Sequence, residues 1–188
     1  LIDRTGPEAV VELTHKLGVK TEIPVQPSIA LGAVDITVED MVAAYSTFAN
    51  QGVYVKPQFL SRIENKSGEV IYEPIPESHD VLNKDIAFAV IKLLQGVTES
   101  GSGVRLRTQG GGSGDNRWTG YPYMFTNPIA GKTGTTQNNA DGWFMGLTPE
   151  LVTGVWVGAE DRAVRFRSMN WGQGARMALP IYGYYMQS

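Results

Sequence analysis

The stretch that decides the fold runs from Pro128 to Gly158 and reads PIAGKTGTTQNNADGWFMGLTPELVTGVWVG. It holds three runs rich in β-branched and aromatic residues, at 128–136, 141–147 and 151–158, and such runs are typical of strands. Thr148-Pro149-Glu150 predicts a tight turn between the last two runs. The stretch therefore predicts a meander of three strands.

A helix is expected after this meander, from about Gly174 to Tyr185. The spacing of its apolar residues predicts that Met177, Ile181 and Tyr184 or Tyr185 pack on the sheet. The last third of the chain is thus expected to form a sheet covered by a helix.

Three further helical patterns precede the meander. Thr5 with Glu8 predicts a capping box for a first helix that Gly18 ends, and Thr37 with Asp40 predicts the start of a second that Gly52 ends. The third and most amphipathic pattern runs from about Asn83 to Thr98. The apolar positions at helical spacing are Val10, Leu13 and Leu17, then Val38, Met41, Val42, Tyr45, Phe48 and Ala49, then Ile86, Val90, Leu93, Leu94 and Val97.

Between the second and third helical patterns, the runs 58–64 and 69–72 predict a hairpin with a turn at Asn65-Lys66-Ser67-Gly68. Six glycines between Gly101 and Asn116 predict a Gly-rich loop at 101–116 with a mobile middle. Helices, then strands, then a helix indicate an α+β architecture for residues 1–188.

Composition excludes several classes of function. The chain has 188 residues and a net charge of −3, which does not suit a nucleic-acid binder that neutralises phosphates. It has no cysteine, which excludes disulfides, thiolate metal sites and cysteine nucleophiles. Its two histidines, His15 and His79, lie in different segments and are interpreted as surface or satisfied interior residues. No apolar run approaches the length of a membrane span.

The string from Ala130 to Thr136 invites a phosphate-loop interpretation, which fails because position 126 is threonine where that motif needs glycine. As a strand, the string places the hydroxyls of Thr133 and Thr135 on one side, while Gly134 allows close approach of a ligand backbone. Lys132 adds a cation beside them. This set suits a substrate carboxylate and an adjacent carbonyl that becomes negative in acyl transfer, although a Gly-Thr-rich edge strand with an exposed lysine is the alternative.

The residues around this string resemble a known family. The shared residues are Ala130 to Thr136, Asn138, Asp141, Trp143-Phe144, Gly146, Thr148-Pro149 and Gly154 to Gly158. They resemble the stretch around the third active-site motif of penicillin-binding proteins, and most closely the transpeptidase domain of the bifunctional, high-molecular-mass class A enzymes. Leu31-Gly32-Ala33, Thr37 to Tyr54 and Gly101-Ser102-Gly103 extend the resemblance over most of the chain.

The resemblance implies the fold of serine β-lactamases and DD-peptidases, a five-stranded antiparallel sheet flanked by helices. It implies Lys132 and Thr135 as catalytic residues: Lys132 as electrostatic partner of the peptide carboxylate and of a proton-relay serine, and the Thr135 N–H as an oxyanion donor. It also implies Thr133, Gly134 and Thr135 as the substrate-binding residues.

Two motifs of that family are missing. No serine here has a lysine three residues later, so the nucleophile motif Ser-x-x-Lys is absent. Ser168-Met169-Asn170 spells Ser-x-Asn, but it follows the lysine motif, against the family order, and is interpreted as coincidence. The chain also lacks an initiator methionine, and we interpret it as the C-terminal part of a transpeptidase domain whose missing motifs precede Leu1.

Three other groups of residues have weaker implications. Arg162, Arg165, Arg167 and Arg176 form a cationic cluster, interpreted as a solvated face with contact to peptidoglycan as the alternative. Trp143, Phe144 and Trp156 are interpreted as core. Three aromatic residues before the motif either line the cleft or anchor the loop that precedes the motif: Trp118, Tyr121 and Tyr123.

The resemblance implies that the parent cross-links the stem peptides of peptidoglycan through a serine acyl-enzyme, that β-lactams trap the same serine, and that no cofactor is needed. The expected partners are stem peptides, β-lactams and the N-terminal remainder of the protein. The expected place is the periplasmic side of the inner membrane, through an anchor upstream. The alternatives are a serine β-lactamase or DD-carboxypeptidase, and a non-catalytic β-lactam-sensing module.

Overall fold

The structure, a computed structural model, describes residues 2–32, 34–107 and 123–188. At its centre lies an antiparallel sheet with the strand order β5-β6-β7, formed by β5 (Ala130–Thr135), β6 (Gly142–Leu147) and β7 (Val152–Val157). The Thr148 N–H donates to the Leu151 carbonyl oxygen at 2.9 Å and closes the predicted turn. The three predicted strands are confirmed with slightly shorter ends, and the described residues supply three of the five strands that the resemblance implies.

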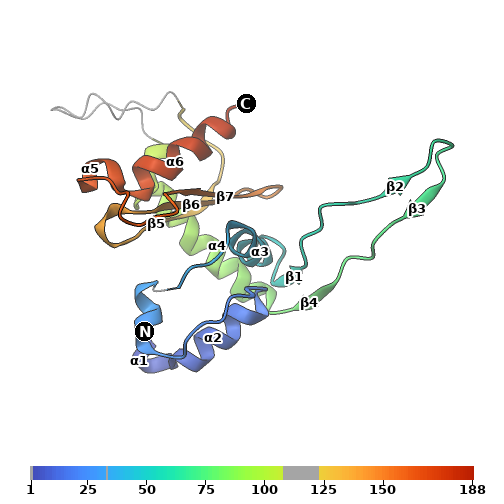
Figure 1. Cartoon of the computed structure of the whole chain (residues 1–188), viewed down its shortest axis with the longest axis horizontal. Helices are drawn as coiled ribbons and strands as arrows, with labels where there is room; N and C mark the ends of the chain where they lie inside the picture. The colour runs from blue at the N-terminus through green and yellow to red at the C-terminus, as the bar shows by residue number, and fades with distance from the viewer. Residues whose placement is uncertain (1, 33, 108–122) are drawn as a thin grey trace.

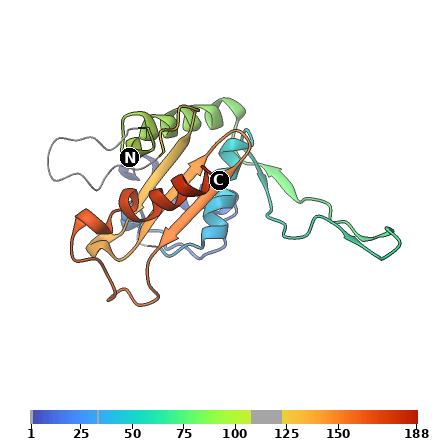
Figure 2. The same ribbon diagram turned by 90° about the horizontal axis from the view of Figure 1, so that it is seen from above.

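Helices cover both faces of this sheet (Figures 1 and 2). Helix α6 (Gly174–Tyr185) lies on one face, α3 (Val38–Ala49) lies on the other, and α4 (Lys84–Glu99) packs beside β5 and α3. The core under α6 holds the fully buried rings of Phe144 and Tyr182, whose centroids are 4.9 Å apart. Gly146 permits this approach, because a Cβ there would lie 2.3 Å from the Tyr182 ring. The α+β class with an antiparallel sheet between helices is confirmed.

The bounds of α6 match the prediction, but its buried face differs in part. Met177 is buried as expected, whereas Ile181, Tyr184 and Tyr185 are 50%, 56% and 56% exposed. The buried stripe follows Ala175, Ala178, Leu179 and Tyr182. Ile181 and Tyr184 lie off this stripe because 100° per residue carries them round the helix, and Tyr185 is the last helical residue.

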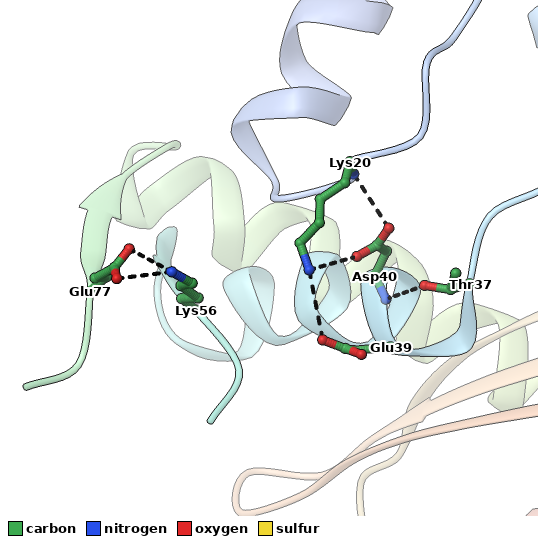
Figure 3. Close-up of polar contacts among 6 residues, drawn as sticks. All are labelled: Lys20, Thr37, Glu39, Asp40, Lys56 and Glu77. Atoms are coloured by element: carbon green, nitrogen blue, oxygen red, sulfur yellow. Dashed lines mark hydrogen bonds and ion pairs between the residues drawn. The ribbon is translucent and has the colours of Figure 1, made fainter. Parts of the chain in front are cut away.

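Helix α3 begins as predicted, since the Thr37 hydroxyl accepts from the Asp40 N–H at 3.1 Å (Figure 3). Asp40 is buried, accepts from the Lys20 N–H at 3.3 Å, and lies 3.8 Å from the Lys20 ammonium. The other buried residues of α3 are small: Ala43, Ala44 and Thr47. Small side chains suit these positions because α3 packs both against the sheet and against α4. The larger apolar residues predicted for its buried face are half-buried beside them.

The capping box predicted for the first helix is wrong. Thr5 ends a short helix α1 (Ile2–Thr5), and Gly6 at φ 82° separates it from α2 (Pro7–Lys16). Proline fits the first turn of α2 because its missing N–H needs no partner there. Val11 and Leu17 are buried, whereas Leu13 is 37% exposed. Gly18 follows the end of the helix at φ 93°, as expected.

Helix α4 also begins where expected, with the Asn83 side chain accepting from the Asp85 N–H at 2.8 Å. Its predicted apolar stripe is not buried throughout, since Ile86 is 53% and Leu93 76% exposed. The residues that α4 buries are Ala87 and Thr98. Small side chains allow the helix to approach β5 closely, so the larger apolar residues are left on other faces of the helix.

The predicted hairpin, with its turn at 65–68, is confirmed and lies near the tip of a long arm that projects from the body (Figures 1 and 2). Its first strand is much shorter than predicted, since it covers residues 63–64 rather than 58–64. Strands β1 (Val53–Val55) and β4 (Ser78–Asp80) pair at its base, and β2 (Ile63–Glu64) and β3 (Val70–Tyr72) pair near its tip. At the base, the Lys56 ammonium lies 2.9 Å and 3.0 Å from the two Glu77 carboxylate oxygens (Figure 3). The arm buries little, since Phe59 and Ile75 are 87% and 88% exposed.

The remaining elements are short. They are η1 (Pro27–Leu31), η2 (Val104–Leu106), η3 (Gln137–Asn139) and α5 (Met169–Gly172). Within the predicted Gly-rich loop, residues 101–107 form a turn and η2 with a buried Leu106, and residues 108–116 lie outside the described residues. Trp118 and Tyr121 also lie outside them, whereas Tyr123 is fully buried in the core and anchors the segment before β5.

The structure bears on two expectations drawn from composition. Both histidines are satisfied at the surface, where His15 Nδ1 lies 2.9 Å from the Val19 carbonyl oxygen and His79 Nε2 lies 2.9 Å from that of Lys16. Over the described ranges, none of the helices combines the length and apolarity needed to cross a bilayer.

Candidate active site

The candidate site lies along the outer edge of β5, an edge strand of the central sheet. Just beyond β5, the Thr136 N–H donates to the Asp141 carbonyl oxygen at 3.1 Å, toward β6. Backbone groups alternate in direction along a strand, so the N–H groups of Thr133 and Thr135 point away from β6. The edge that carries the predicted motif therefore offers two outward N–H groups.

Lys132 is exposed and places its ammonium at this outer edge. Its Nζ donates to the carbonyl oxygen of Thr133 at 2.7 Å. Lys132 stands opposite Met145 in the register, so its side chain starts on the sheet face opposite to Thr133 and Thr135. The aliphatic part of the Lys132 side chain bends round the edge of β5, so that its ammonium reaches the Thr133 carbonyl oxygen. The cation therefore lies beside the threonines of β5, as predicted.

Thr133 is held by a residue that the sequence did not identify as part of the site. The hydroxyl oxygens of Thr133 and Ser102 are 2.6 Å apart. Ser102 lies in the Gly101-Ser102-Gly103 turn after α4, and the Gly103 N–H donates to the Val97 carbonyl oxygen at 2.9 Å. Gly101 is required in this turn, because a Cβ there would lie 2.8 Å from the Val97 Cα.

A second contact fixes the same turn against β5. The buried Thr98 hydroxyl donates to the Ile129 carbonyl oxygen at 2.5 Å. This pair and the Ser102–Thr133 pair are both separated by 31 residues in sequence. The end of α4 therefore runs alongside β5 and fixes its position at two points.

Thr135 connects the site to α6. Its hydroxyl oxygen accepts from the Gly174 N–H at 3.0 Å and keeps its own hydrogen for a ligand. Gly174 is required here, because a Cβ would lie 2.1 Å from the Gly134 carbonyl oxygen. A Cβ on Gly134 would lie 2.9 Å from the Trp143 Cβ. Contact with Trp143 is thus a reason for glycine at 134 that the sequence interpretation did not include.

This arrangement suits one kind of chemistry. A cation, two hydroxyls and two outward N–H groups line an open strand edge, which is what a peptide carboxylate and a neighbouring oxyanion require. In the part of the chain that the structure describes, no group of three or more His, Cys, Asp or Glu side chains could hold a metal ion.

The other candidates lie elsewhere. Arg162 pairs with Asp35, Arg165 and Arg167 are exposed, and Arg176 is half-buried. Ser168 precedes α5 rather than lying between helices upstream of the motif. Phe144 is core as predicted, whereas Trp143 is half-buried and Trp156 is 41% exposed.

An apolar pocket of about 210 Å³ lies on another part of the molecule, between α3, α4, the start of β5 and the turn that follows β6. Its lining includes Phe48, Phe88, Ile91 and Leu147, and it contains none of the motif residues from Lys132 to Thr135. It is therefore distinct from the candidate site.

Comparisons with known proteins identify relatives for most of the chain. The family model for the penicillin binding protein transpeptidase domain matches residues 16–161. Penicillin-binding protein 1A of Aquifex aeolicus is 36% identical over 187 residues, covering 100% of this chain and 23% of the relative. Penicillin-binding protein 1B of Escherichia coli is 30% identical over 182 residues, covering 96% of this chain and 19% of the relative.

Solved structures agree in fold. Penicillin-binding protein 1A from Haemophilus influenzae matches with a TM-score of 0.82 at 22% identity, over 99% of this chain and 31% of that one. PonA1 from Mycobacterium tuberculosis in complex with penicillin V matches with a TM-score of 0.74 at 24% identity, over 96% of this chain and 49% of that one. The chain spans about a quarter or less of the length of these curated relatives. With the family model matching more than half of its residues, the chain belongs to the transpeptidase-domain family of the penicillin-binding proteins.

Proposed function

We propose that this chain supplies the substrate-binding strand of a peptidoglycan DD-transpeptidase that β-lactams inhibit. The observation that carries the proposal is the outer edge of β5. There the Lys132 ammonium donates a hydrogen bond to the Thr133 carbonyl oxygen, and the Thr135 N–H points outward. The names of the relatives support it, since they are penicillin-binding proteins and one solved relative holds penicillin V.

In this proposal, the terminal carboxylate of a stem peptide binds the Lys132 ammonium and the Thr133 and Thr135 hydroxyls. The carbonyl of the preceding D-Ala then lies against the Thr135 N–H. Attack by a serine hydroxyl turns that carbonyl oxygen into an oxyanion, which the preorganised N–H stabilises. Binding and oxyanion stabilisation are thus supplied by the same strand.

The covalent steps follow from acyl transfer. The serine oxygen forms an ester with the penultimate D-Ala, the amide bond breaks, and the terminal D-Ala leaves with the proton that the serine gave up. The amine of a neighbouring peptide then attacks the ester, forms the cross-link and returns a proton to the serine. A β-lactam acylates the same serine by opening its ring amide, so its leaving amine stays attached.

The serine must come from outside residues 1–188, because no serine in this sequence has a lysine three residues later. The partners in this proposal are therefore the N-terminal remainder of the protein, stem peptides and β-lactams. The reaction takes place in the cell envelope, outside the cytoplasmic membrane, and needs no cofactor.

The test uses the intact parent protein and a fluorescent penicillin. Labelling is expected on a serine outside residues 1–188, located by mass spectrometry of the labelled peptide.

Lys132→Ala should lower the acylation rate by about 100- to 1000-fold, as loss of one preorganised electrostatic contact does in comparable oxyanion sites. Lys92→Ala is the matched control, because this lysine is exposed on α4 and donates to Gln95. Labelling within residues 1–188, or a Lys132→Ala rate within twofold of the unaltered protein, would overturn the proposal.

A further inference from the structure

The loop from Arg162 to Trp171, here called the arginine loop, carries positive charge that the structure does not neutralise. Four of the sixteen Lys and Arg residues of the chain follow Asp161, and none of the nineteen Asp and Glu residues does. Arg162 pairs with Asp35. Arg165 and Arg167 are exposed, and no carboxylate of the described residues lies within ion-pair distance of either. Two guanidinium groups are thus available to a ligand.

Apolar side chains are exposed between and beside these cations. Phe166 is 44% exposed, Met169 57% and Trp171 60%. Arginine together with exposed aromatic residues is the composition enriched in protein binding surfaces. The arginine loop therefore offers both charge and apolar contact.

Hydrogen bonds hold the arginine loop against η3, the short helix that follows β5. The Phe166 N–H donates to the Asn139 carbonyl oxygen at 3.2 Å, and the Asn139 side-chain amide donates to the Phe166 carbonyl oxygen at 3.5 Å. Gly172 packs so closely that a Cβ there would lie 2.2 Å from the Asn139 Cβ. Asn139 belongs to η3, which follows β5 within the same stretch of chain. The loop thus lies just past the Thr135 end of the candidate site.

The direction of the bound peptide leads to this loop, an argument that rests on the proposed function. A carboxylate at Thr133 and the preceding carbonyl at Thr135 make the peptide run antiparallel to β5. Its residues upstream of the reacting carbonyl then extend past Thr135 toward η3. At about 3.3 Å per extended residue, two or three residues span about 7–10 Å beyond Thr135, toward η3 and the backbone of the arginine loop that is bonded to it.

We propose that the arginine loop is a subsite for an acidic segment of the peptide donor. Carboxylates two or three residues before the reacting carbonyl bind Arg165 and Arg167, and the aliphatic parts of the same segment pack on Phe166 and Trp171. The match to the family model ends at residue 161, so the arginine loop lies outside it.

The test compares two synthetic donors in the intact parent protein. Both end in D-Ala-D-Ala, and they differ only in having Glu or Gln two residues before the penultimate D-Ala. The unaltered protein is expected to prefer the Glu donor about tenfold in kcat/KM, mainly through KM, as charge-assisted contacts allow. In the Arg165→Gln, Arg167→Gln double variant this preference should fall to about one, and the corresponding double change to Lys should restore part of it.

Arg62→Gln is the matched control, since Arg62 is exposed on the arm and pairs with Glu64, away from the site. It should leave the Glu-over-Gln preference unchanged. The proposal is overturned if the unaltered protein shows no preference, if the double variant keeps it, or if both donors lose rate equally. Penicillin labelling of the unaltered protein separates the two proposals, because its absence would reject the transpeptidase assignment itself.

Discussion

Single residues decide how the strand edge is presented to a ligand. Thr133 contacts Ser102 through its hydroxyl, and its carbonyl oxygen accepts from the Lys132 ammonium. Thr135 is held by the Gly174 N–H. Each hydroxyl of the candidate site is thus fixed by one partner from another element, so the candidate site is ordered without a ligand.

Ser102 is expected to act as a positioning residue through Thr133. In the intact parent protein, Ser102→Ala should lower penicillin acylation about 3- to 10-fold, since one hydrogen bond contributes about 0.5–1.5 kcal/mol. Ser102→Thr keeps a hydroxyl and should restore most of the rate. Ser100→Ala, two residues earlier at the exposed end of α4, serves as control. Equal rates for Ser102→Ala and Ser102→Thr would contradict the positioning role.

Burial raises the pKa of Tyr182 from its ordinary value of 10.0 to about 12, an effect that the nearby Arg107 partly offsets. The neutral phenol is therefore favoured in the folded state. The stabilisation is fully present below pH 10 and is lost as pH rises from 10 toward 12. Two pKa units correspond to about 2–3 kcal/mol.

Urea denaturation at pH 8, 10 and 11 tests this expectation for Tyr182. Between pH 8 and pH 11, the stability of Tyr182→Phe relative to the unaltered protein should rise. The expected gain in the free energy of unfolding is on the order of 1 kcal/mol or more, as linkage gives for this pKa shift. Tyr72→Phe, on the exposed arm, is the control for the loss of a tyrosine hydroxyl. A pH-independent difference for Tyr182→Phe would show that its phenol titrates alike in the folded and unfolded states.

At the scale of elements, local chemistry predicted where helices begin better than which faces they bury. The cap at Thr37 followed from residue types within a few positions, and the spacing of apolar residues placed the start of α4 near Asn83. The capping box at Thr5 failed because Gly6 and Pro7 together start a new helix. The exposure of Leu93 could not be predicted, since helical spacing marks apolar positions without showing whether a partner covers them.

The end of α3 gives a test with an internal control. Gly52 has φ 94°, and a Cβ there would lie 2.2 Å from the Leu82 carbonyl oxygen. Gly32 has φ 71°, but nothing lies within 4 Å of its ideal Cβ. Gly32→Ala should cost about 1–2 kcal/mol in stability from backbone strain alone, and Gly52→Ala about 1–3 kcal/mol more from the clash. Chemical denaturation of both variants measures the difference, and equal losses would contradict this account.

At the scale of the whole molecule, the site depends on contacts that no local pattern reveals. The pairs Thr98–Ile129 and Ser102–Thr133 bring together segments 31 residues apart. The candidate motif from Lys132 to Thr135 could be proposed from sequence because its residues are contiguous. The contact of Ser102 with this motif could not, since only the packing of α4 beside β5 places Ser102 there. The contact between η3 and the arginine loop is likewise a property of the folded chain.

The arm is expected to contribute little to the stability of the body. Joining Pro57 to Pro76 by a short Gly-Ser turn keeps the Lys56–Glu77 pair and the pairing of β1 with β4. Because the removed side chains include the exposed Phe59, Ile71 and Ile75, the melting temperature should change by less than about 3 °C, which is under 1 kcal/mol. Calorimetry measures it, with Tyr54→Ala in β1 at the base of the arm as a variant expected to lose more, since Tyr54 is buried. A large loss on removing the arm would show that it supports the fold.

The position of β7 in the sheet has a consequence for handling the protein. Its sequence, VTGVWV, has no charge and no proline, and in the described part of the chain no strand pairs with its far side. Such an edge serves as a template for strands of other molecules. Chain 1–188 prepared alone should therefore self-associate as its concentration rises, and light scattering should detect this. Thr153→Lys, which places a charge on that strand, should raise the concentration at which self-association begins. The solubility of a preparation would then indicate whether this edge of β7 is covered.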